Sequence, residues 1–209
     1  NGEGTFPPVP HRGRAMEEAA AGLACGITAV LGLARDKLAR ACEEASSLGV
    51  VQICNYNCPG QLVISGEKAA VDRAGELAKE LGAKRCMPLK VSGPFHTALM
   101  KPAGDALAAH FRTMDLGEPS IPVYFNCLGD KREEQTIPEL LERQVQSSVY
   151  WEDTVRAMER DGVDTVLEIG PGKTLSGFFK KTAPAIRTHH IDTADDFAAF
   201  VAAWKGETL

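Results

Sequence analysis

Residues 50–65 read VVQICNYNCPGQLVIS, and this stretch decides the fold. Its two apolar runs, 50–57 and 61–65, are rich in valine and isoleucine, which favour β-strands. Between the runs lies Asn57-Cys58-Pro59-Gly60, and a Pro-Gly pair is a strong turn signal. The stretch therefore predicts two strands joined by a tight turn.

Strand and helix patterns alternate on both sides of this pair. On the N-terminal side, Gly26–Leu33 predicts a short buried strand and Ala34–Ser47 an amphipathic helix. On the C-terminal side, Lys68–Leu81 predicts a second helix and Arg85–Val91 a fourth strand. The order β-α-β-β-α-β over about 70 residues is the split βαβ, or ferredoxin-like, pattern. We therefore expect a ferredoxin-like subdomain over residues 26–92.

The sequence after His96 has a different organisation. Helices are expected over 98–113, 138–146, 151–160, 173–181 and 195–204, and strands over 121–126, 165–169 and 186–191. Such alternation implies α/β layering with a mostly parallel sheet, so we expect residues 93–209 to belong to an α/β core. Residues 1–11 contain three prolines and no periodicity, which predicts an irregular lead-in before a core helix over 12–25.

Composition and charge exclude several classes of protein. The chain has 209 residues, of which 44% are hydrophobic and 24% charged, as is usual for a soluble globular protein. Its formal net charge of -5 argues against a nucleic-acid surface. The sequence contains neither an apolar run of the roughly 20 residues that span a bilayer nor a signal-peptide pattern. We therefore expect a cytoplasmic protein that contacts no membrane.

The cysteine pattern predicts neither disulfides nor a metal site. Six cysteines are present, but no Cys-x-x-Cys pair occurs and no His-x-x-x-His motif completes a zinc site. Most of them lie in apolar stretches, where a free cysteine behaves as a small hydrophobic residue. We expect reduced core cysteines, in keeping with a reducing compartment.

Two residues are candidates for chemistry. His96 follows a predicted strand and the pair Gly93-Pro94, where a side chain can be held beside a crevice. Judged alone, His96 is better interpreted as a residue that caps the next helix. Arg12 is a natural bidentate receptor for a free carboxylate, although a lone arginine at a helix start is usually solvated.

Two further motifs carry a weaker signal. Residues 170–174, GPGKT, do not complete a phosphate-binding P-loop, because Leu167 occupies the position that needs the first glycine. Asn55, Asn57 and Gln61 lie around the Pro-Gly turn, where their amides could contact a polar ligand. Asparagine beside a turn usually serves the turn itself.

Six segments occur in a fixed order along the chain. They are Arg12-Gly13-x-x-Met16-x-Glu18-Ala19, residues 55–66 (NYNCPGQLVISG), residues 88–100 (PLKVSGPFHTALM), Arg143-Gln144, Val149-x-Trp151 and Glu168-x-Gly170-Pro171-Gly172-Lys173. In this order they resemble bacterial malonyl-CoA:acyl carrier protein transacylases of type II fatty acid synthesis. The resemblance covers almost everything from Arg12 onward.

The resemblance implies a fold and a reaction. The fold is a hydrolase-like α/β core interrupted by a ferredoxin-like subdomain, which agrees with the βαββαβ order noted above. The reaction is ping-pong transfer of malonyl from malonyl-CoA, through a serine, to the phosphopantetheine thiol of acyl carrier protein. No cofactor is implied, because malonyl-CoA and phosphopantetheine are substrates.

The resemblance also assigns roles around the histidine. His96 would be the general base for the serine, and the backbone carbonyl at Gln144 would hold its other ring nitrogen. Arg12 would bind the malonyl carboxylate, with Met16 lining the same pocket.

Further substrate contacts follow from the same resemblance. Asn55 and Asn57 would lie along the groove for CoA and pantetheine. Phe95, directly before the histidine, favours malonyl over methylmalonyl, because a bulky ring leaves little room for an α-methyl group. One methyl group is worth only about 1–3 kcal/mol, so this is a preference.

The sequence departs from the family in one respect. The family's nucleophile sits on a Gly-x-Ser-x-Gly elbow, and no serine of this sequence has the flanking glycines. We therefore expect the C-terminal part of such a transacylase, inactive alone, whose serine comes from a complementary N-terminal half. The alternatives are a non-catalytic module that binds acyl carrier protein or CoA, and an acyltransferase domain of a polyketide or fatty acid synthase.

Overall fold

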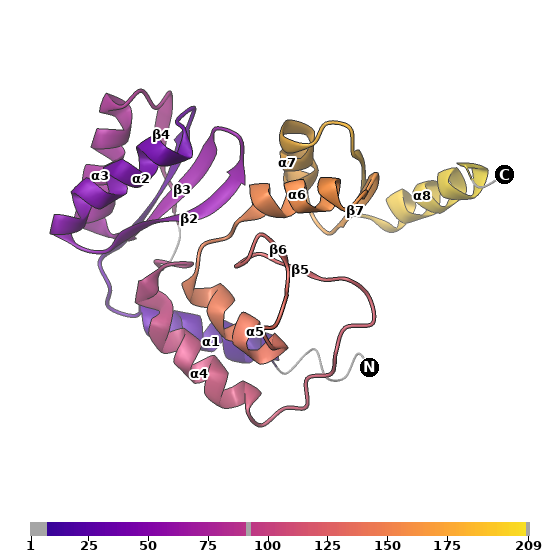
Figure 1. Cartoon of the computed structure of the whole chain (residues 1–209), viewed down its shortest axis with the longest axis horizontal. Helices are drawn as coiled ribbons and strands as arrows, with labels where there is room; N and C mark the ends of the chain where they lie inside the picture. The colour runs from indigo at the N-terminus through magenta and orange to yellow at the C-terminus, as the bar shows by residue number, and fades with distance from the viewer. Residues whose placement is uncertain (1–7, 91–92, 208–209) are drawn as a thin grey trace. The chain divides into compact units, whose positions relative to one another are not determined.

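The computed structural model describes residues 8–90 and 93–207. The chain forms two compact units, residues 1–154 and residues 155–209, each described here by itself (Figure 1). Of the expected elements, most of the irregular lead-in and the end of the fourth strand, residues 91 and 92, lie outside the described residues.

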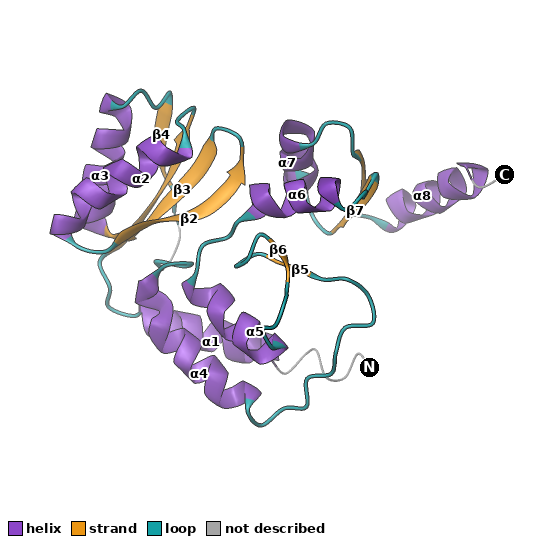
Figure 2. Cartoon of the chain, viewed as in Figure 1, coloured by secondary structure: helices purple, strands orange, loops and turns teal. Residues whose placement is uncertain are grey.

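The first unit contains a four-stranded antiparallel sheet with two helices on one face (Figure 2). Its elements are β1 (Cys25–Leu31), α2 (Arg35–Ala45), β2 (Val51–Cys58), β3 (Gln61–Glu67), α3 (Lys68–Glu80) and β4 (Arg85–Pro88). The strand order is β2-β3-β1-β4, with every neighbouring pair antiparallel. This is the ferredoxin-like arrangement, so the prediction from the βαββαβ order is confirmed.

The sheet and its helices share one hydrophobic core. Val30 of β1, Leu38 of α2 and Ile64 of β3 are all fully buried in it. Alternate residues of a strand point to opposite faces, and residues three or four apart share a helix face, so each element presents one apolar side to the others. Burial of each such aliphatic side chain contributes about 1.5–3 kcal/mol.

A second part of the first unit consists mainly of helices. They are α1 (Pro8–Ala20), the 3₁₀ turn η3 (Ala98–Met100), α4 (Lys101–Phe111) and α5 (Ile137–Gln146). Figure 1 shows α1, α4 and α5 side by side, and Ala103, Leu107 and Val145 form the buried centre of their contact.

Two expectations for this part need correction. The helix expected over 12–25 is α1, which already includes Pro8, because a proline in the first turn of a helix loses no internal hydrogen bond. The helix ends at Ala20, two residues before Gly22, whose φ of +77° is left-handed. The strand expected over 121–126 is only β5 (Tyr124–Phe125), paired with β6 (Asp130–Lys131). Pro122 lacks the N–H that a strand ladder needs.

Helix α6 (Trp151–Arg160) runs into the second unit, which has a small parallel sheet. Strands β7 (Thr165–Ile169) and β8 (Arg187–Ile191) pair in parallel, with α7 (Thr174–Thr182) between them in sequence and α8 (Ala194–Glu207) after them. Within the described residues parallel pairing of named strands is confined to these two, so the expectation of a mostly parallel sheet was too broad.

The described residues contain no disulfide, no helix that could span a membrane and no metal-ligand cluster. All six cysteines are free thiols, and four of them are buried. None of the helices in residues 8–90 and 93–207 is both long and apolar enough to cross a membrane. The same residues contain no cluster of three or more His, Cys, Asp or Glu side chains that could hold a metal ion.

Gly66 provides a test of the ferredoxin-like sheet. Its φ is +154°, and a Cβ there would lie 1.9 Å from the Val50 carbonyl oxygen, which belongs to the backbone. We expect Gly66→Ala to lower the free energy of unfolding by at least about 2 kcal/mol in urea denaturation. Gly75, inside α3, has open space around a new Cβ, so Gly75→Ala should instead stabilise the chain by about 0.5–1 kcal/mol. Equal effects of the two substitutions would contradict this account.

Candidate active site

His96 lies in the loop between β4 and α4, in an uncommon backbone conformation. Its φ is +61°, and it is the one non-glycine residue with positive φ in the described part of the chain. The hydroxyl of Thr97 donates a hydrogen bond to the Pro94 carbonyl over 2.7 Å, which closes the turn around the histidine. The His96 N–H donates to the Val145 carbonyl over 3.3 Å. Contacts on both sides therefore hold the left-handed residue in place.

The imidazole ring is fixed by one backbone carbonyl. Its Nδ1 lies 2.9 Å from the carbonyl oxygen of Gln144, at the end of α5. A carbonyl can only accept, so Nδ1 must carry the proton in this contact. In the neutral ring Nε2 is then unprotonated, which is the form that a general base requires.

Burial favours the same neutral form. Removal from water is the main cause that lowers the pKa of His96, and the nearby Arg12 charge lowers it further. The backbone groups of Gln144 and Ser147 act in the opposite sense, because they stabilise the protonated ring. The net effect is a pKa below the ordinary 6.5, so the imidazole is mostly neutral at pH 7.

A cavity of about 710 Å³ lies beside α1 and the His96 loop. Its lining includes Arg12, Met16 and Phe95, three of the residues expected to surround the acyl group. Burial lowers the pKa of the Arg12 guanidinium, and no charged partner offsets this effect. In the described part of the chain no carboxylate forms an ion pair with Arg12. A half-buried cation without a counter-charge is a receptor for an anion.

Gly93 allows the loop to approach α1 this closely. A Cβ at position 93 would lie 2.8 Å from the Ala20 methyl group and 2.8 Å from the Phe95 ring. Any larger residue would therefore push Phe95 or α1 away from the cavity.

Asn55 and Asn57 lie on β2, away from the lining of this cavity. Both are half-buried. The backbone of Asn55 forms a parallel bridge with Val149, which follows Gln144 by five residues. The structure thus brings together Arg12, Met16 and Phe95 around the cavity, and joins β2 to the segment that holds His96.

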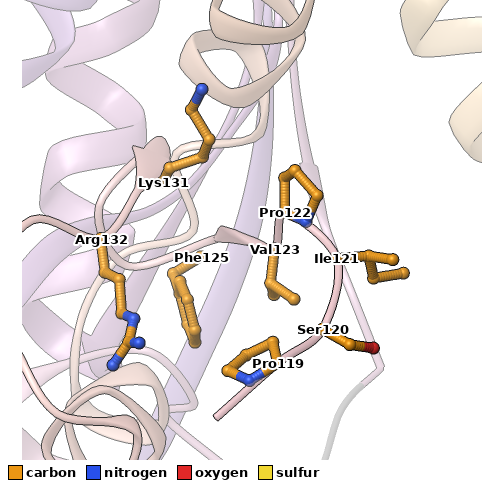
Figure 3. A pocket seen from close by; sticks show the side chains of 8 residues that line it. All are labelled: Pro119, Ser120, Ile121, Pro122, Val123, Phe125, Lys131 and Arg132. Atoms are coloured by element: carbon orange, nitrogen blue, oxygen red, sulfur yellow. The ribbon is translucent and has the colours of Figure 1, made fainter.

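A second cavity of about 340 Å³ has a different setting. Figure 3 shows Pro119, Val123 and Phe125 around it, with the basic side chains of Lys131 and Arg132 at its margin. None of the site residues expected from the sequence lines it. Arg132 already has an ion-pair partner, Glu118.

Sequence reasoning missed several residues that hold the histidine. These are Gln52, Val145, Ser147 and Ser148. Gln52, Val145 and Ser147 contact His96 or its neighbours, and Ser148 bonds to Ile53 on β2. Each contact joins positions more than 40 residues apart, and no local pattern marks such contacts. Only the fold brings them together.

Comparison with solved structures identifies the class of fold. The chain matches the malonyl CoA-acyl carrier protein transacylase from Clostridium perfringens with a TM-score of 0.92 and 34% identity, over 96% of this chain and 64% of that one. It matches a malonyl-transacylase solved in complex with a type II PKS acyl-carrier protein with a TM-score of 0.85 and 40% identity, over 92% of this chain and 63% of that one. The fold is therefore the mixed α/β fold of the transacylases.

Comparison with curated sequences narrows the class. The chain is 42% identical to the malonyl CoA-acyl carrier protein transacylase of Bacillus subtilis, over 86% of this chain and 57% of the relative. No family model matches the chain. The chain is homologous to malonyl CoA-acyl carrier protein transacylases, as its motifs predicted, and it spans about three fifths of their length.

The lowered pKa of His96 yields a test. In an NMR titration of the chain the imidazole should titrate below 6.5, and Arg12→Met should raise the midpoint, because it removes a nearby positive charge. Arg14→Met, on the exposed side of the same helix, is the matched control and should leave the midpoint unchanged. A midpoint at or above 6.5 in the unmodified chain would contradict the burial argument.

The free energy of unfolding should depend on pH through the same protonation of His96. The unfolded chain binds this proton more readily than the folded chain, so unfolding becomes easier as the pH falls below 6.5.

Proposed function

We propose that this chain carries the base and the carboxylate receptor of a malonyl-transfer site. The reaction would move malonyl from malonyl-CoA to the phosphopantetheine thiol of an acyl carrier protein and so supply fatty acid synthesis. One observation carries the proposal: Arg12 is half-buried, forms no ion pair with a carboxylate of residues 8–90 and 93–207, and lines a cavity beside the loop that holds a neutral His96.

The proposed reaction has two steps. A serine oxygen, supplied by residues outside this sequence, attacks the malonyl thioester while His96 Nε2 takes the serine proton. The C–S bond breaks, and the same proton passes to the departing CoA sulfur. In the second step Nε2 takes the proton of the carrier thiol, whose sulfur attacks the serine ester, and returns that proton to the serine oxygen.

Arg12 would select the acyl group. Its guanidinium can form two parallel hydrogen bonds with the free carboxylate of malonyl, which an acetyl group lacks. Met16 and Phe95 line the same cavity and would pack against the short methylene between the two carbonyl carbons. Asn55 and Asn57 would contact the pantetheine chain, as their positions on β2 near the Gln144 segment allow.

The partners and setting belong to the same proposal. The substrates are malonyl-CoA and an acyl carrier protein, and the chemistry described needs no further cofactor. The free thiols of all six cysteines favour a reducing compartment, and we place the reaction in the cytoplasm.

A chimera tests the proposal. In it this chain replaces the homologous part of the Bacillus subtilis relative, which provides the remaining sequence. We expect the chimera to transfer radiolabelled malonyl from CoA to carrier protein. His96→Gln should lower kcat/KM by about 10²–10⁴, because the serine loses its base. Arg12→Met should lower malonyl transfer and leave the slow transfer of acetyl unaffected.

The controls decide between the outcomes. Arg14→Met should behave as the unmodified chimera, and the isolated chain should take up no label that survives denaturing electrophoresis. Full malonyl transfer by the His96→Gln chimera, or stable label on the isolated chain, would overturn the proposed roles.

Phe95 provides a separate test of substrate choice. Its ring lines the cavity beside Arg12, where an α-methyl group of the substrate would meet it. In the chimera, Phe95→Ser should raise the ratio of methylmalonyl to malonyl transfer by about 5- to 160-fold, which corresponds to the 1–3 kcal/mol of one methyl group. Competition between the two CoA esters measures this ratio directly, and an unchanged ratio would exclude Phe95 as the selective residue.

A further inference from the structure

The segment that holds the His96 ring is itself attached to the ferredoxin-like sheet. Residues 144–150 comprise the last turn of α5 and the residues after it, and the Gln144 carbonyl at their start accepts from His96 Nδ1. Further along, the Val149 N–H donates to the Cys54 carbonyl, and the Tyr56 N–H donates to the Val149 carbonyl, both over 2.8 Å. These backbone bonds fix where the segment runs along β2.

One side chain of this segment adds to the attachment. The hydroxyl of Ser148 is partly buried and donates to the carbonyl of Ile53, on β2, over 2.7 Å. Ser148 follows Gln144 by four residues, and the backbone of Ser147 between them also affects the imidazole. A shift of Ser148 would therefore move the groups that face the ring.

A second side chain ties the other flank of the histidine to the same strand. The Oε1 atom of Gln52 accepts a hydrogen bond from the Ala98 N–H over 2.7 Å. Ala98 comes two residues after His96, at the start of the turn η3. Gln52 and Ile53 are neighbours on β2, so one short piece of this strand holds the chain on both sides of the imidazole.

We propose that Gln52 and Ser148 are positioning residues for His96. Gln52 attaches the loop that carries the ring to β2, and Ser148 attaches to the same strand the segment whose Gln144 carbonyl accepts from the ring. Together they keep Nδ1 against that carbonyl. The inference rests on the proposed function for its catalytic meaning, since it concerns the same histidine. The geometry that it predicts can be measured without any reaction.

Other contacts also hold this segment to the ferredoxin-like subdomain, and they involve neither Gln52 nor Ser148. Tyr56 and Tyr150 stack with ring centroids 5.0 Å apart. Arg35 of α2 forms ion pairs with Glu152 and Asp153 at 3.1 and 3.0 Å. Loss of one hydroxyl or one amide should therefore loosen the histidine while the fold persists.

The test is ¹⁵N NMR of the imidazole in the whole chain, without substrate. In the unmodified chain the two ring nitrogens should differ widely in shift, with the proton on Nδ1. Ser148→Ala and Gln52→Ala should each move the tautomer equilibrium toward the Nε2–H form by about 2- to 10-fold, as loss of one hydrogen bond allows. The Ala98 amide should also exchange faster with solvent in Gln52→Ala.

Conservative variants separate positioning from general damage. Ser148→Thr keeps the hydroxyl and Gln52→Glu keeps an acceptor oxygen, so both should restore the tautomer. Ser47→Ala removes an exposed hydroxyl that donates to the Glu44 carbonyl, three residues earlier, and it should leave the ring shifts unchanged.

Three results would overturn the inference. They are unchanged ring shifts in both alanine variants, equal disruption by alanine and by the conservative residue, or an equal shift in Ser47→Ala. Each result is independent of whether the chimera transfers malonyl, so failure of the positioning role and failure of the proposed function remain distinguishable.

Discussion

The outer edge of β2 is the constraint on which the first unit depends. This strand ends the order β2-β3-β1-β4, so one of its edges has no partner within the sheet. An uncovered edge exposes unpaired N–H and C=O groups, and here residues around Val149 take up that edge. The segment after α5 is thereby placed, and with it the Gln144 carbonyl that fixes His96. The ferredoxin-like subdomain thus helps to define the geometry around His96, although it supplies neither His96 nor Arg12.

The electrostatics of the site follow from that placement. Burial keeps the imidazole neutral, and the carbonyl on Nδ1 leaves Nε2 without a proton. A carbonyl orients the ring as an aspartate would, yet it adds no buried negative charge close to Arg12. In the proposed function, the guanidinium would therefore remain available to an anionic acyl group. Within the described residues, the neutral imidazole of His96 and the charged guanidinium of Arg12 therefore lie near each other without a shared carboxylate.

The sequence predicted the helices and strands better than it predicted how distant segments pair and pack. Periodicity and the Pro-Gly turn were sufficient for the ferredoxin-like subdomain, since its strands and helices are close in sequence and strongly patterned. The α/β class was also predicted, whereas parallel pairing of named strands in the described residues is confined to β7 and β8. Strand β6, only two residues long, gave no pattern at all. For the site, the motif around His96 and the arginine at position 12 were visible. Gln52 and Ser148 were not, because their contacts join positions 46 and 95 residues apart.

The same long separation in sequence also matters while the protein is being synthesised on the ribosome. Strand β2 leaves the ribosome well before the residues that cover its edge, since 95 positions separate Ile53 from Ser148. At synthesis rates of about 5–20 residues per second, that edge stays uncovered for roughly 5–20 seconds. During this interval the nascent chain displays a ready template for pairing with other chains. A chaperone bound to β2 in those seconds would prevent such pairing until the residues around Val149, which cover the edge, have been synthesised.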